Sequence, residues 1–267
     1  MPETHRILPS STVKLLDLPT RSEGFHDDRS TAENEFEKLR DEFINWQPKL
    51  YAEGKRKLLI VLQAMDAGGK DSTIRKIFRG VNPQGVTVSS FKAPSHEDLA
   101  HDYLWRIHRR VPKQGMIGVF NRSHYEDVLV VRVENLVPED VWRPRYEQIN
   151  QFEKMLTDSG TTVLKFFLHI SKDEQRERFQ ARIDNPKKHW KFSAEDLNKR
   201  KDWDAYMSAY QEMLAKCSTV DAPWHVIPAD QKWYRNLAIS RVVVDALRKL
   251  SPQYPESDLE DQLQNID

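Results

Sequence analysis

The stretch LIVLQAMDAGGKDST, from Leu59 to Thr73, decides the fold of this chain. It opens in a short apolar run, 58–62, whose length and branched side chains are typical of a buried strand. The run breaks at Gly68-Gly69-Lys70, and a basic helical pattern follows. In such an order of elements, backbone N–H groups and the positive end of a helix face one concavity, and the lysine reaches over the phosphates. The stretch therefore predicts a phosphate-binding loop, with a plain strand-to-helix turn as the alternative.

The predicted loop departs from the pattern G-x-x-x-x-G-K-[ST] at two positions. Ala64 stands at the first glycine, and Asp71 stands where the metal-binding hydroxyl is expected, with Ser72 one place later. Asp66 adds a carboxylate inside the turn. We expect a loop that holds metal through acids and phosphate through its last glycine and its lysine.

The bulk composition describes one domain with a well-solvated exterior. The chain has 267 residues, enough for one substantial core, and a mean hydropathy of −0.72. Lys and Arg total 41, as do Asp and Glu, so overall charge predicts no affinity for nucleic acid or membranes. The single Cys217 rules out an internal disulfide and fits a reducing compartment. With no signal-peptide pattern and no apolar run near ~18 residues, we expect a cytoplasmic protein.

Apolar runs and turn signals predict strands that alternate with helices. The predicted strands are 58–62, 86–91, 116–120, 163–170 and 224–228. The predicted helices are 32–50 with a capping box at Ser30 and Glu33, 70–79, 95–110, 141–156, 171–185, 193–214 and 237–250. This alternation argues for an α/β fold with a parallel sheet covered on both faces.

Three segments are expected along the chain. Residues 1–29 form an extended arm, residues 30–254 form the catalytic domain, and residues 255–267 form an acidic tail. A lid is expected at about 178–200. There Arg178 and Arg182 share a helix face, and the basic loop 187–191 follows, an arrangement suited to closing over phosphates. The alternative is a solvated face whose arginines pair with Glu174 and Glu177.

The carboxyl ends of parallel strands are where ligands bind in such sheets. This rule places the loop 66–70, Lys92 and the segment 121–127 along one rim. Acids this close to a phosphate site repel the substrate unless a cation bridges them, so they predict Mg²⁺. Arg122 and Arg132 supply fork-shaped donors for phosphate oxygens. The alternative for Arg122 is a local ion pair with Asp127.

Many cations gather on the same side, which suggests a long polyanion as ligand. They stand on the two segments that follow the first and second strands: Arg75, Lys76, Arg79, Arg106, Arg109 and Arg110. The nine histidines show no metal-ligand spacing, which argues against a zinc site.

Four motifs in this order and spacing resemble polyphosphate kinase family 2. They are AMDAGGKDSTI (64–74), NRSHYEDVLVVRV (121–133), HWKFSAEDL (189–197) and APWHVIPAD (222–230), and the similarity runs from about residue 30 to 250. The resemblance implies a P-loop kinase-like three-layer α/β/α fold similar to thymidylate kinase, with a helical lid. It also implies that Mg²⁺, with Mn²⁺ as an alternative, supports movement of a terminal phosphoryl group between inorganic polyphosphate and a nucleotide. The NRSxYEDVLV form is typical of the subgroup called class III, whose members accept AMP and ADP.

The rim and the resemblance together assign the candidate site residues. The catalytic set is Asp66, Lys70, Arg122, Asp127 and Arg178, with Asp66 and Asp127 as metal ligands. The nucleotide-binding set is Asn121, Glu126, Arg132, Arg182, Trp190 and Lys191. The polyphosphate-binding set is Ala67, Gly68, Gly69, Lys70, Asp71, Ser72, Arg75, Lys76, Lys92, Arg106 and Arg109. Many family members have Asp at position 121 and a neutral or basic residue at 126–127, so which carboxylate binds each metal stays open.

The expected reaction is reversible phosphorylation of AMP to ADP and of ADP to ATP by polyphosphate. The expected partners are polyphosphate and adenine or guanine nucleotides, without nucleic acid or membrane, in a homodimer or homotetramer as in the family. One alternative is an ATP-dependent nucleoside or nucleotide kinase, which has no need of the extra cations. Another is a non-catalytic polyanion-binding protein, against which the neutral net charge and the clustered carboxylates argue.

Overall fold

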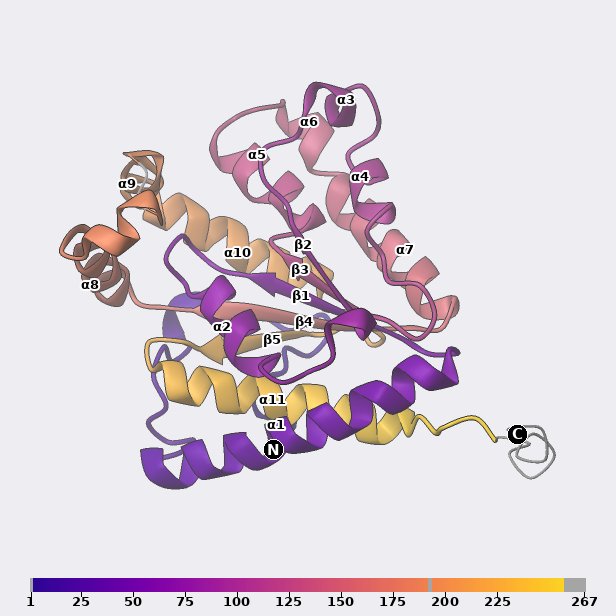
Figure 1. Cartoon of the computed structure of the whole chain (residues 1–267). Helices are drawn as coiled ribbons and strands as arrows, with labels where there is room; N and C mark the ends of the chain where they lie inside the picture. Colours follow the sequence, from indigo (N-terminus) through magenta and orange to yellow (C-terminus); the bar gives the residue numbers. More distant parts are fainter. Residues whose placement is uncertain (1, 192–193, 257–267) are drawn as a thin grey trace.

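The computed structural model describes residues 2–191 and 194–256, and within them the chain forms a five-stranded parallel sheet (Figure 1). The strand order is β2-β3-β1-β4-β5. The strands are β1 (Lys57–Gln63), β2 (Val86–Ser90), β3 (Ile117–Asn121), β4 (Thr161–His169) and β5 (Trp224–Pro228). All five predicted strands are confirmed, with small shifts at their ends.

The strand β1 lies at the centre of the sheet, between β3 and β4. Its residues 58–62 are buried, because helices cover both faces and leave no solvated side for polar residues. The loop that follows β1 therefore emerges at the middle of the rim, where the ends of β3 and β4 also arrive.

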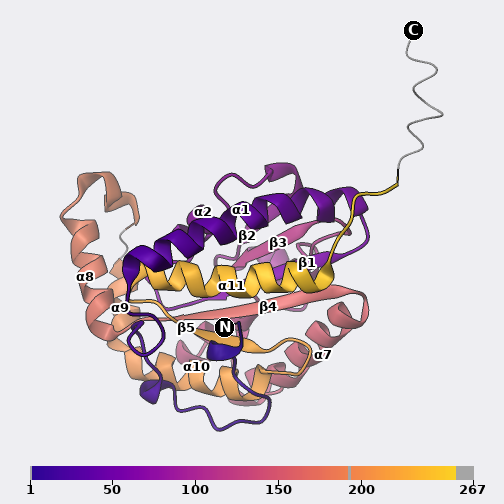
Figure 2. The same ribbon diagram turned by 90° about the horizontal axis from the view of Figure 1, so that it is seen from below.

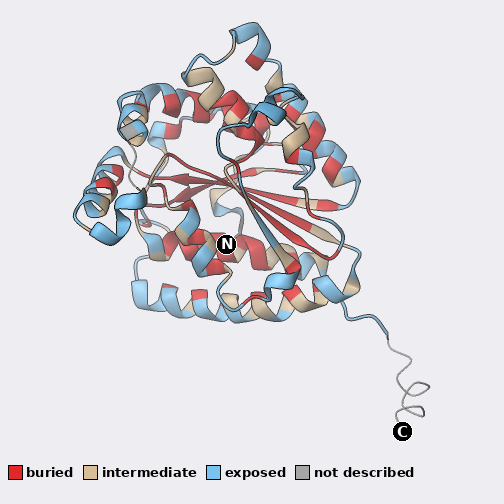
Figure 3. Ribbon diagram, turned by 45° about the horizontal axis from the view of Figure 1, so that its top comes forward, coloured by how far each residue is buried: buried red, intermediate tan, exposed pale blue. Residues whose placement is uncertain are grey.

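Two helical layers enclose the sheet (Figures 1 and 2). One face carries α1 (Arg29–Glu53), α2 (Lys70–Ile77) and α11 (Lys232–Leu250), and the other carries α7 (Arg145–Asp158) and α10 (Trp203–Cys217). Figure 3 shows buried residues concentrated in the sheet and on the helix faces turned towards it. The predicted three-layer α/β/α, P-loop kinase-like fold is confirmed.

The predicted lid segment stands at the end of the sheet where the phosphate loop lies (Figure 1). It consists of α8 (Lys172–Ile183), η5 (Pro186–Lys191) and α9 (Ala194–Lys201). The predicted start of α8 is confirmed, since the Glu174 N–H donates to Ser171 Oγ at 3.1 Å. The start of α9 was expected at Ser193, which lies outside the described residues.

Three predicted helices are interrupted in the structure. The helix 95–110 is two single turns, α3 (His96–Leu99) and α4 (Trp105–His108). Between them Asp102 Oδ1 accepts the Leu104 N–H at 3.0 Å, so a local side-chain turn replaces the helical bond. The helix 141–156 divides into α6 (Glu139–Trp142) and α7 at Pro144, which has no N–H to continue the ladder. The helix 193–214 divides into α9 and α10 around Asp202, the N-cap of α10.

Two predicted helix starts were wrong. The helix α1 is capped by Asp28, whose carboxylate accepts from Ser30 N at 2.9 Å and Thr31 N at 3.2 Å, so Ser30 is not the cap. The helix α11 begins at Lys232 rather than at residue 237. Its first turns contain Arg235 and Asn236, which are buried although their types suggest an exposed position. Because these polar residues are buried, the apolar pattern of the sequence did not indicate where this helix starts.

The N-terminal segment packs along the edge strand β5 and contains η1 (Pro2–His5) and η2 (Leu15–Asp17). Ile7 N donates to Trp224 O at 2.8 Å, and the side chains of Val13 and Leu15 are buried. Short connecting turns complete the described chain: η3 (Pro83–Gly85), η4 (His124–Val128) and α5 (Val130–Val133). None of the helices in the described ranges is long and apolar enough to cross a membrane.

Candidate active site

The loop between β1 and α2 is a tight turn. Gly68 N donates to Met65 O at 2.9 Å, and Ala67 has a φ of 61°. Gly69 has a φ of 101°, and a Cβ there would lie 2.2 Å from Arg235 Nη1. Only glycine meets both conditions. The turn places the N-terminus of α2, with its unsatisfied N–H groups, at the edge of the sheet where the strands end.

Lys70 is folded back against this loop. Its Nζ donates to Ala64 O at 2.8 Å, and the side chain is buried. Burial, followed by the neighbouring charge of Arg122, lowers the pKa of Lys70 to about 8 against the opposing effect of Asp66. The ammonium group is therefore held beside the loop in a poorly hydrated site, where a phosphate would stabilise its charge.

Arg122 connects the loop to the end of β3. Its Nη2 lies 2.6 Å from Asp66 Oδ1, and its Nη1 lies 3.6 Å from Glu126 Oε2. Burial acts to lower the pKa of Arg122, but Glu126 and Asp66 outweigh it and raise the pKa above its ordinary value. The alternative of an ion pair between Arg122 and Asp127 was wrong.

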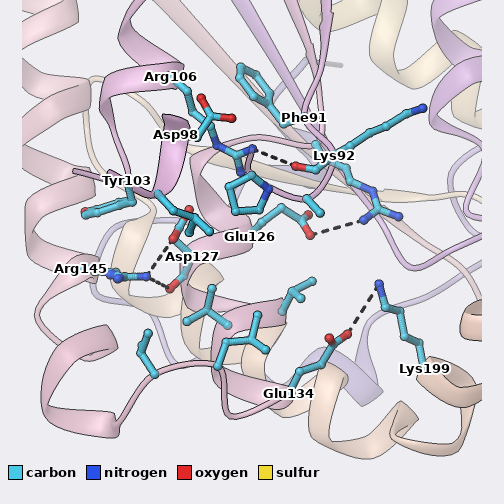
Figure 4. A pocket seen from close by; sticks show the side chains of 18 of the residues that line it. Phe91, Lys92, Asp98, Tyr103, Arg106, Glu126, Asp127, Glu134, Arg145 and Lys199 are labelled. Atoms are coloured by element: carbon cyan, nitrogen blue, oxygen red, sulfur yellow. Dashed lines mark hydrogen bonds and ion pairs between the residues drawn. The ribbon is translucent and has the colours of Figure 1, made fainter. Parts of the chain in front are cut away.

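Asp127 faces a different cation (Figure 4). Its Oδ1 accepts from Arg145 Nη1 at 2.8 Å, and Arg145 lies over the Tyr103 ring, 4.6 Å from its centroid. Burial raises the pKa of Asp127 to about 6, although Arg145 opposes the shift. Neither Arg145 nor Tyr103 was among the site residues predicted from the sequence. Arg145 lies on α7, which has the pattern of an ordinary amphipathic helix, and Tyr103 lies between α3 and α4 in a segment predicted as a helix.

A cavity of about 910 Å³ opens beside these side chains (Figure 4). Its volume suits a nucleotide-sized ligand. Its basic walls are Lys92, Arg106, Arg122, Arg145 and Lys199, and its apolar walls include Phe91, Val130, Val131, Leu136 and Val137. Its acidic walls are Asp98, Asp102, Glu126, Asp127, Glu134, Glu195 and Asp202. Arg106 is held at the rim by its Nη1, which donates to Lys92 O at 2.8 Å.

Arg178 joins the predicted lid segment to the loop 66–70. Its Nη1 donates to Ala67 O at 3.0 Å, its Nη2 to Ala229 O at 2.6 Å, and its Nε to Glu174 Oε1 at 2.6 Å. The pair with Glu174 that the alternative expected is present, but Arg178 is largely buried rather than solvated, and it also reaches the loop. Gln175 adds a second connection, with Nε2 donating to Asp66 O at 2.9 Å.

The other predicted lid residues lie further out. Arg182 donates to Lys191 O at 3.0 Å and lies 3.2 Å from Asp196 Oδ2. Lys191 Nζ lies 3.9 Å from Asp71 Oδ2, on the first turn of α2. Trp190 is 78% exposed. Arg182 and Lys191 therefore connect the predicted lid segment to itself and to α2.

Asn121 also contacts the first turn of α2. Its Nδ2 donates to Asp71 Oδ1 at 2.6 Å, and Ser72 Oγ donates to Gly69 O at 2.8 Å. The polar groups at the end of β3 and the start of α2 are therefore already in contact around the loop.

Several predicted site residues do not reach the cavity. Arg132 donates to Tyr146 Oη at 3.1 Å and to Glu212 Oε2 at 2.5 Å. Arg109 lies over the Trp105 ring, 4.6 Å from its centroid, in a separate hollow. Arg75 and Lys76 are exposed on the outer side of α2. Only Arg106 and Lys92 of the predicted polyphosphate cations line the large cavity.

Comparison with known proteins identifies the family. The protein-family model described as Polyphosphate kinase 2 (PPK2) matches residues 26–255. The chain belongs to the polyphosphate kinase 2 family. An AMP/ADP-polyphosphate phosphotransferase of Meiothermus ruber is 53% identical over 253 residues, covering 94% of this chain and 95% of that protein. An ADP-polyphosphate phosphotransferase of Rhodopseudomonas palustris is 44% identical, covering 94% and 91%.

A solved structure supports the same family. The crystal structure of polyphosphate kinase 2 from Arthrobacter aurescens TC1 superimposes with a TM-score of 0.92 at 42% identity, covering 96% of this chain and 92% of that chain. The family resemblance stated from the four motifs is confirmed. The predicted enzyme class, a polyphosphate kinase, is confirmed with it.

Kinases generally use a divalent metal ion for phosphoryl transfer. In the described ranges no three His, Cys, Asp or Glu side chains converge to hold a metal. Phosphoryl transfer does not need such a cage, since a divalent ion such as Mg²⁺ can be held by one or two carboxylates together with substrate phosphates and water. Asp66 and Glu126 both contact Arg122, and Asp127 follows directly. These carboxylates could supply one or two oxygen ligands to a metal ion that binds together with the substrate phosphates.

Proposed function

We propose that this enzyme transfers the terminal phosphoryl group of inorganic polyphosphate to AMP and to ADP, reversibly and with Mg²⁺. One observation carries the proposal. Arg122 contacts Asp66 in the phosphate loop at 2.6 Å and also lines the 910 Å³ cavity, so an anion cradle and a nucleotide-sized cavity share one guanidinium. A transferred group between donor and acceptor would contact that guanidinium throughout the reaction.

In this proposal the polyphosphate end occupies the loop 66–70 and the acceptor nucleotide occupies the cavity. Lys70, Arg122 and Arg178 stabilise charge on the transferred group, which is the main task in phosphoryl transfer. The acceptor is already an anion, so no general base is required. Bound Mg²⁺ would supply further charge neutralisation, with Asp66 and Asp127 as its proposed protein ligands; Mn²⁺ is a substitute of similar chemistry.

The cavity walls support a phosphorylated acceptor. Arg106 and Lys92 bring cations to them, while Arg145 and Lys199 are paired with Asp127 and Glu134. The apolar side chains offer a surface for a base. The use of both AMP and ADP is proposed from the activity for which the Meiothermus ruber relative is named. Guanine nucleotides are a second candidate, because a GDP-polyphosphate phosphotransferase of Pseudomonas aeruginosa is 32% identical over 84% of this chain. We leave Arg132 out of the nucleotide site, since it pairs with Glu212.

The outer cations have a proposed role along the donor. Arg75, Lys76 and Arg109 lie outside the cavity, where they would hold more distant parts of a polyphosphate chain. The division into an arm at 1–29, a catalytic domain at 30–254 and an acidic tail at 255–267 stays a prediction, as do a cytoplasmic location and a dimeric or tetrameric assembly. Residues 257–267 of the predicted tail lie outside the described residues.

One assay tests the proposed function against its alternatives. Purified protein is incubated with Mg²⁺, polyphosphate and either AMP or ADP, with no ATP added, and ATP and ADP are quantified by chromatography. Formation of ADP from AMP and of ATP from ADP supports the proposal. Phosphorylation of nucleotides only when ATP replaces polyphosphate identifies an ATP-dependent kinase. Retention of polyphosphate without turnover identifies a binding protein.

A further inference from the structure

Arg235 is a buried arginine directly below the phosphate loop. It lies in the first turns of α11, and its side chain is 1% exposed. Its Nη1 occupies the space that a side chain at position 69 would need, since a Cβ on that residue would lie only 2.2 Å from it. The buried guanidinium group is therefore in contact with Gly69.

The charge of Arg235 has little compensation. Its Nε and Nη2 donate to Asn236 Oδ1 at 3.3 Å and 2.9 Å, and within the described residues its Nη1 has no hydrogen-bond partner. None of the ion pairs in the described part of the chain includes Arg235, and the charge that affects it is that of Arg178. Burial, followed by Arg178, lowers the pKa of Arg235 to about 9.

Another buried cation in the same fold shows the contrast. Lys165 is fully buried, and its Nζ lies 2.5 Å from Glu153 Oε2. A buried charge without such a partner is costly, which is why buried arginines and lysines are normally paired. The fold retains Arg235 without a carboxylate at a place where an anion is expected above it.

We propose that Arg235 is a further positioning residue of the phosphate site, and that the phosphate held on the loop 66–70 is the electrostatic counterpart of its guanidinium. This inference rests on the proposed placement of polyphosphate on that loop. The bound anion would relieve the cost of the buried charge, so part of the binding free energy comes from a group beneath the loop. It follows that anion binding and folding stability are coupled through Arg235.

The opposing interpretation is that Arg235 only fills space beneath the loop. The two interpretations differ in what happens without an anion. A space-filling arginine stabilises the free protein, whereas an uncompensated charge destabilises it and is useful only when the anion is bound. Removal of the charge at constant side-chain size separates them.

The experiment measures thermal melting and equilibrium binding of inorganic tripolyphosphate, without metal or nucleotide. It compares the wild type with Arg235→Met, which removes the charge, and Arg235→Lys, which keeps it. The matched control is Arg241→Met, on the same helix, because Arg241 forms a pair with Glu35 at 2.7 Å through both carboxylate oxygens. Lys70→Met serves as the reference for loss of the loop site.

We expect Arg235→Met to bind tripolyphosphate at least tenfold more weakly and to melt no lower than the wild type when no anion is present. Arg235→Lys should bind within about threefold of the wild type. Arg241→Met should melt lower yet bind normally. The inference is overturned if Arg235→Met melts lower without the anion and binds as the wild type does. If Arg235→Met does not fold, Arg235→Lys decides, because a tenfold loss in that variant shows that charge is not what matters.

The same measurements distinguish a failure of the role proposed for Arg235 from a failure of the proposed phosphate site on the loop 66–70. If the wild type does not bind tripolyphosphate, or if Lys70→Met binds it normally, the loop is not the phosphate site and both proposals fail. If Lys70→Met loses binding while Arg235→Met retains it, the loop placement stands and only the role of Arg235 is refuted.

Discussion

The guanidinium of Arg122 lies 2.6 Å from the carboxylate of Asp66, which joins the end of β3 to the loop after β1. The register of the sheet produces this contact, because Leu62 is paired with Asn121 and Arg122 N donates to Leu62 O at 3.1 Å. Arg122 also has a φ of 62°, a left-handed backbone that is unusual for a side chain of its size. The arginine is thus held by the sheet beside the loop, where both substrates would meet.

Replacement of Arg122 by lysine should lower kcat about 100-fold or more. Lysine keeps the positive charge but cannot contact Asp66 and a phosphate through a planar fork. Steady-state kinetics with ADP and polyphosphate measure the effect. Arg143→Lys is the control, because Arg143 pairs with Glu139 and Glu212 outside the cavity. A loss of less than threefold in Arg122→Lys would show that charge alone suffices.

Replacement of Lys70 by alanine should cost well over tenfold in turnover and leave the fold intact. The side chain contacts the loop carbonyls of Ala64 and Met65, at 2.8 Å and 3.5 Å, and its charge lies among the charged groups of the proposed phosphate site. Turnover and circular dichroism are measured on the same preparation. Near-normal activity in a folded variant refutes the cradle assignment.

The affinity for tripolyphosphate should fall as the pH rises through about 8. Lys70 has a lowered pKa of about 8 against an ordinary value of 10.5, and burial is the main cause. The buried charge of Lys70 therefore lowers the free energy of unfolding, and this destabilisation is fully present below pH 8. It disappears between pH 8 and 10.5, where the folded protein has lost the proton and the unfolded chain still holds it. An anion binds the charged form, so deprotonation weakens binding. In Lys70→Arg, which stays charged, the fall near pH 8 should be absent. Any change in affinity that remains then comes from tripolyphosphate itself and from Arg235, whose pKa is about 9.

The residues near the loop were largely accessible from the sequence. Asp66, Lys70 and Arg122 lie at strand ends, and strand ends of a parallel sheet share one edge, so a correct order of strands and helices was enough to group them. The pairing partners were not accessible. Whether Arg122 pairs with Asp66 or with Asp127 depends on the backbone turn at position 122, which no local pattern determines.

Residues contributed by distant helices escaped sequence reasoning for a different reason. Arg145 and Arg235 lie on helices whose apolar periodicity predicts only packing, and a polar type is normally placed on the solvated side. Arg145 meets Asp127 across 18 positions, and Arg235 meets Gly69 from the last helix of the fold. Pro144 was a signal in the sequence for the start of α7, because it is the N-cap of this helix and Arg145 is the first helical residue.

Variants of the three carboxylates near Arg122 should differ in how their rates depend on the Mg²⁺ concentration. If Asp127 holds Mg²⁺, then Asp127→Asn should raise the Mg²⁺ concentration for half-maximal rate at least tenfold. If Glu126 contacts the nucleotide, Glu126→Gln should mainly change KM for AMP and ADP. Asp66→Asn should reduce turnover more than either, and chelation of the metal should abolish it in all variants. Rates over a magnesium titration provide the test. A shift in Glu126→Gln instead of Asp127→Asn would reassign the ligand.

Removal of charge at Arg106 and Arg109 should weaken long polyphosphate more than short. Arg106 lines the cavity, while Arg109 lies in a neighbouring hollow and is positioned for phosphates further along the chain. Since each neutralised phosphate adds to binding, the double variant Arg106→Gln/Arg109→Gln should show a larger rise in KM as chain length increases. Arg248→Gln, whose native arginine pairs with Glu42, is the control. Equal effects on tripolyphosphate and on long chains would argue against a path along this surface.

The buried pair of Lys165 and Glu153 should control the stability of the segment that carries the site carboxylates. Lys165 Nζ lies 2.5 Å from Glu153 Oε2, and Glu153 Oε1 accepts from Tyr125 Oη at 2.8 Å, next to Glu126. Burial opposes the charged form of Glu153, but Lys165 and His124 outweigh it and lower the pKa of Glu153.

Breaking this pair should leave one charge buried without a partner. Glu153→Gln is therefore expected to reduce the free energy of unfolding by about 3–5 kcal/mol, whereas the double variant Lys165→Met/Glu153→Leu should recover most of the loss. Urea denaturation measures both. The recovered double variant should still show a lower kcat, because Tyr125 has lost the acceptor that positions the chain just before Glu126 and Asp127. A double variant with normal stability and normal turnover would limit the pair to a packing role.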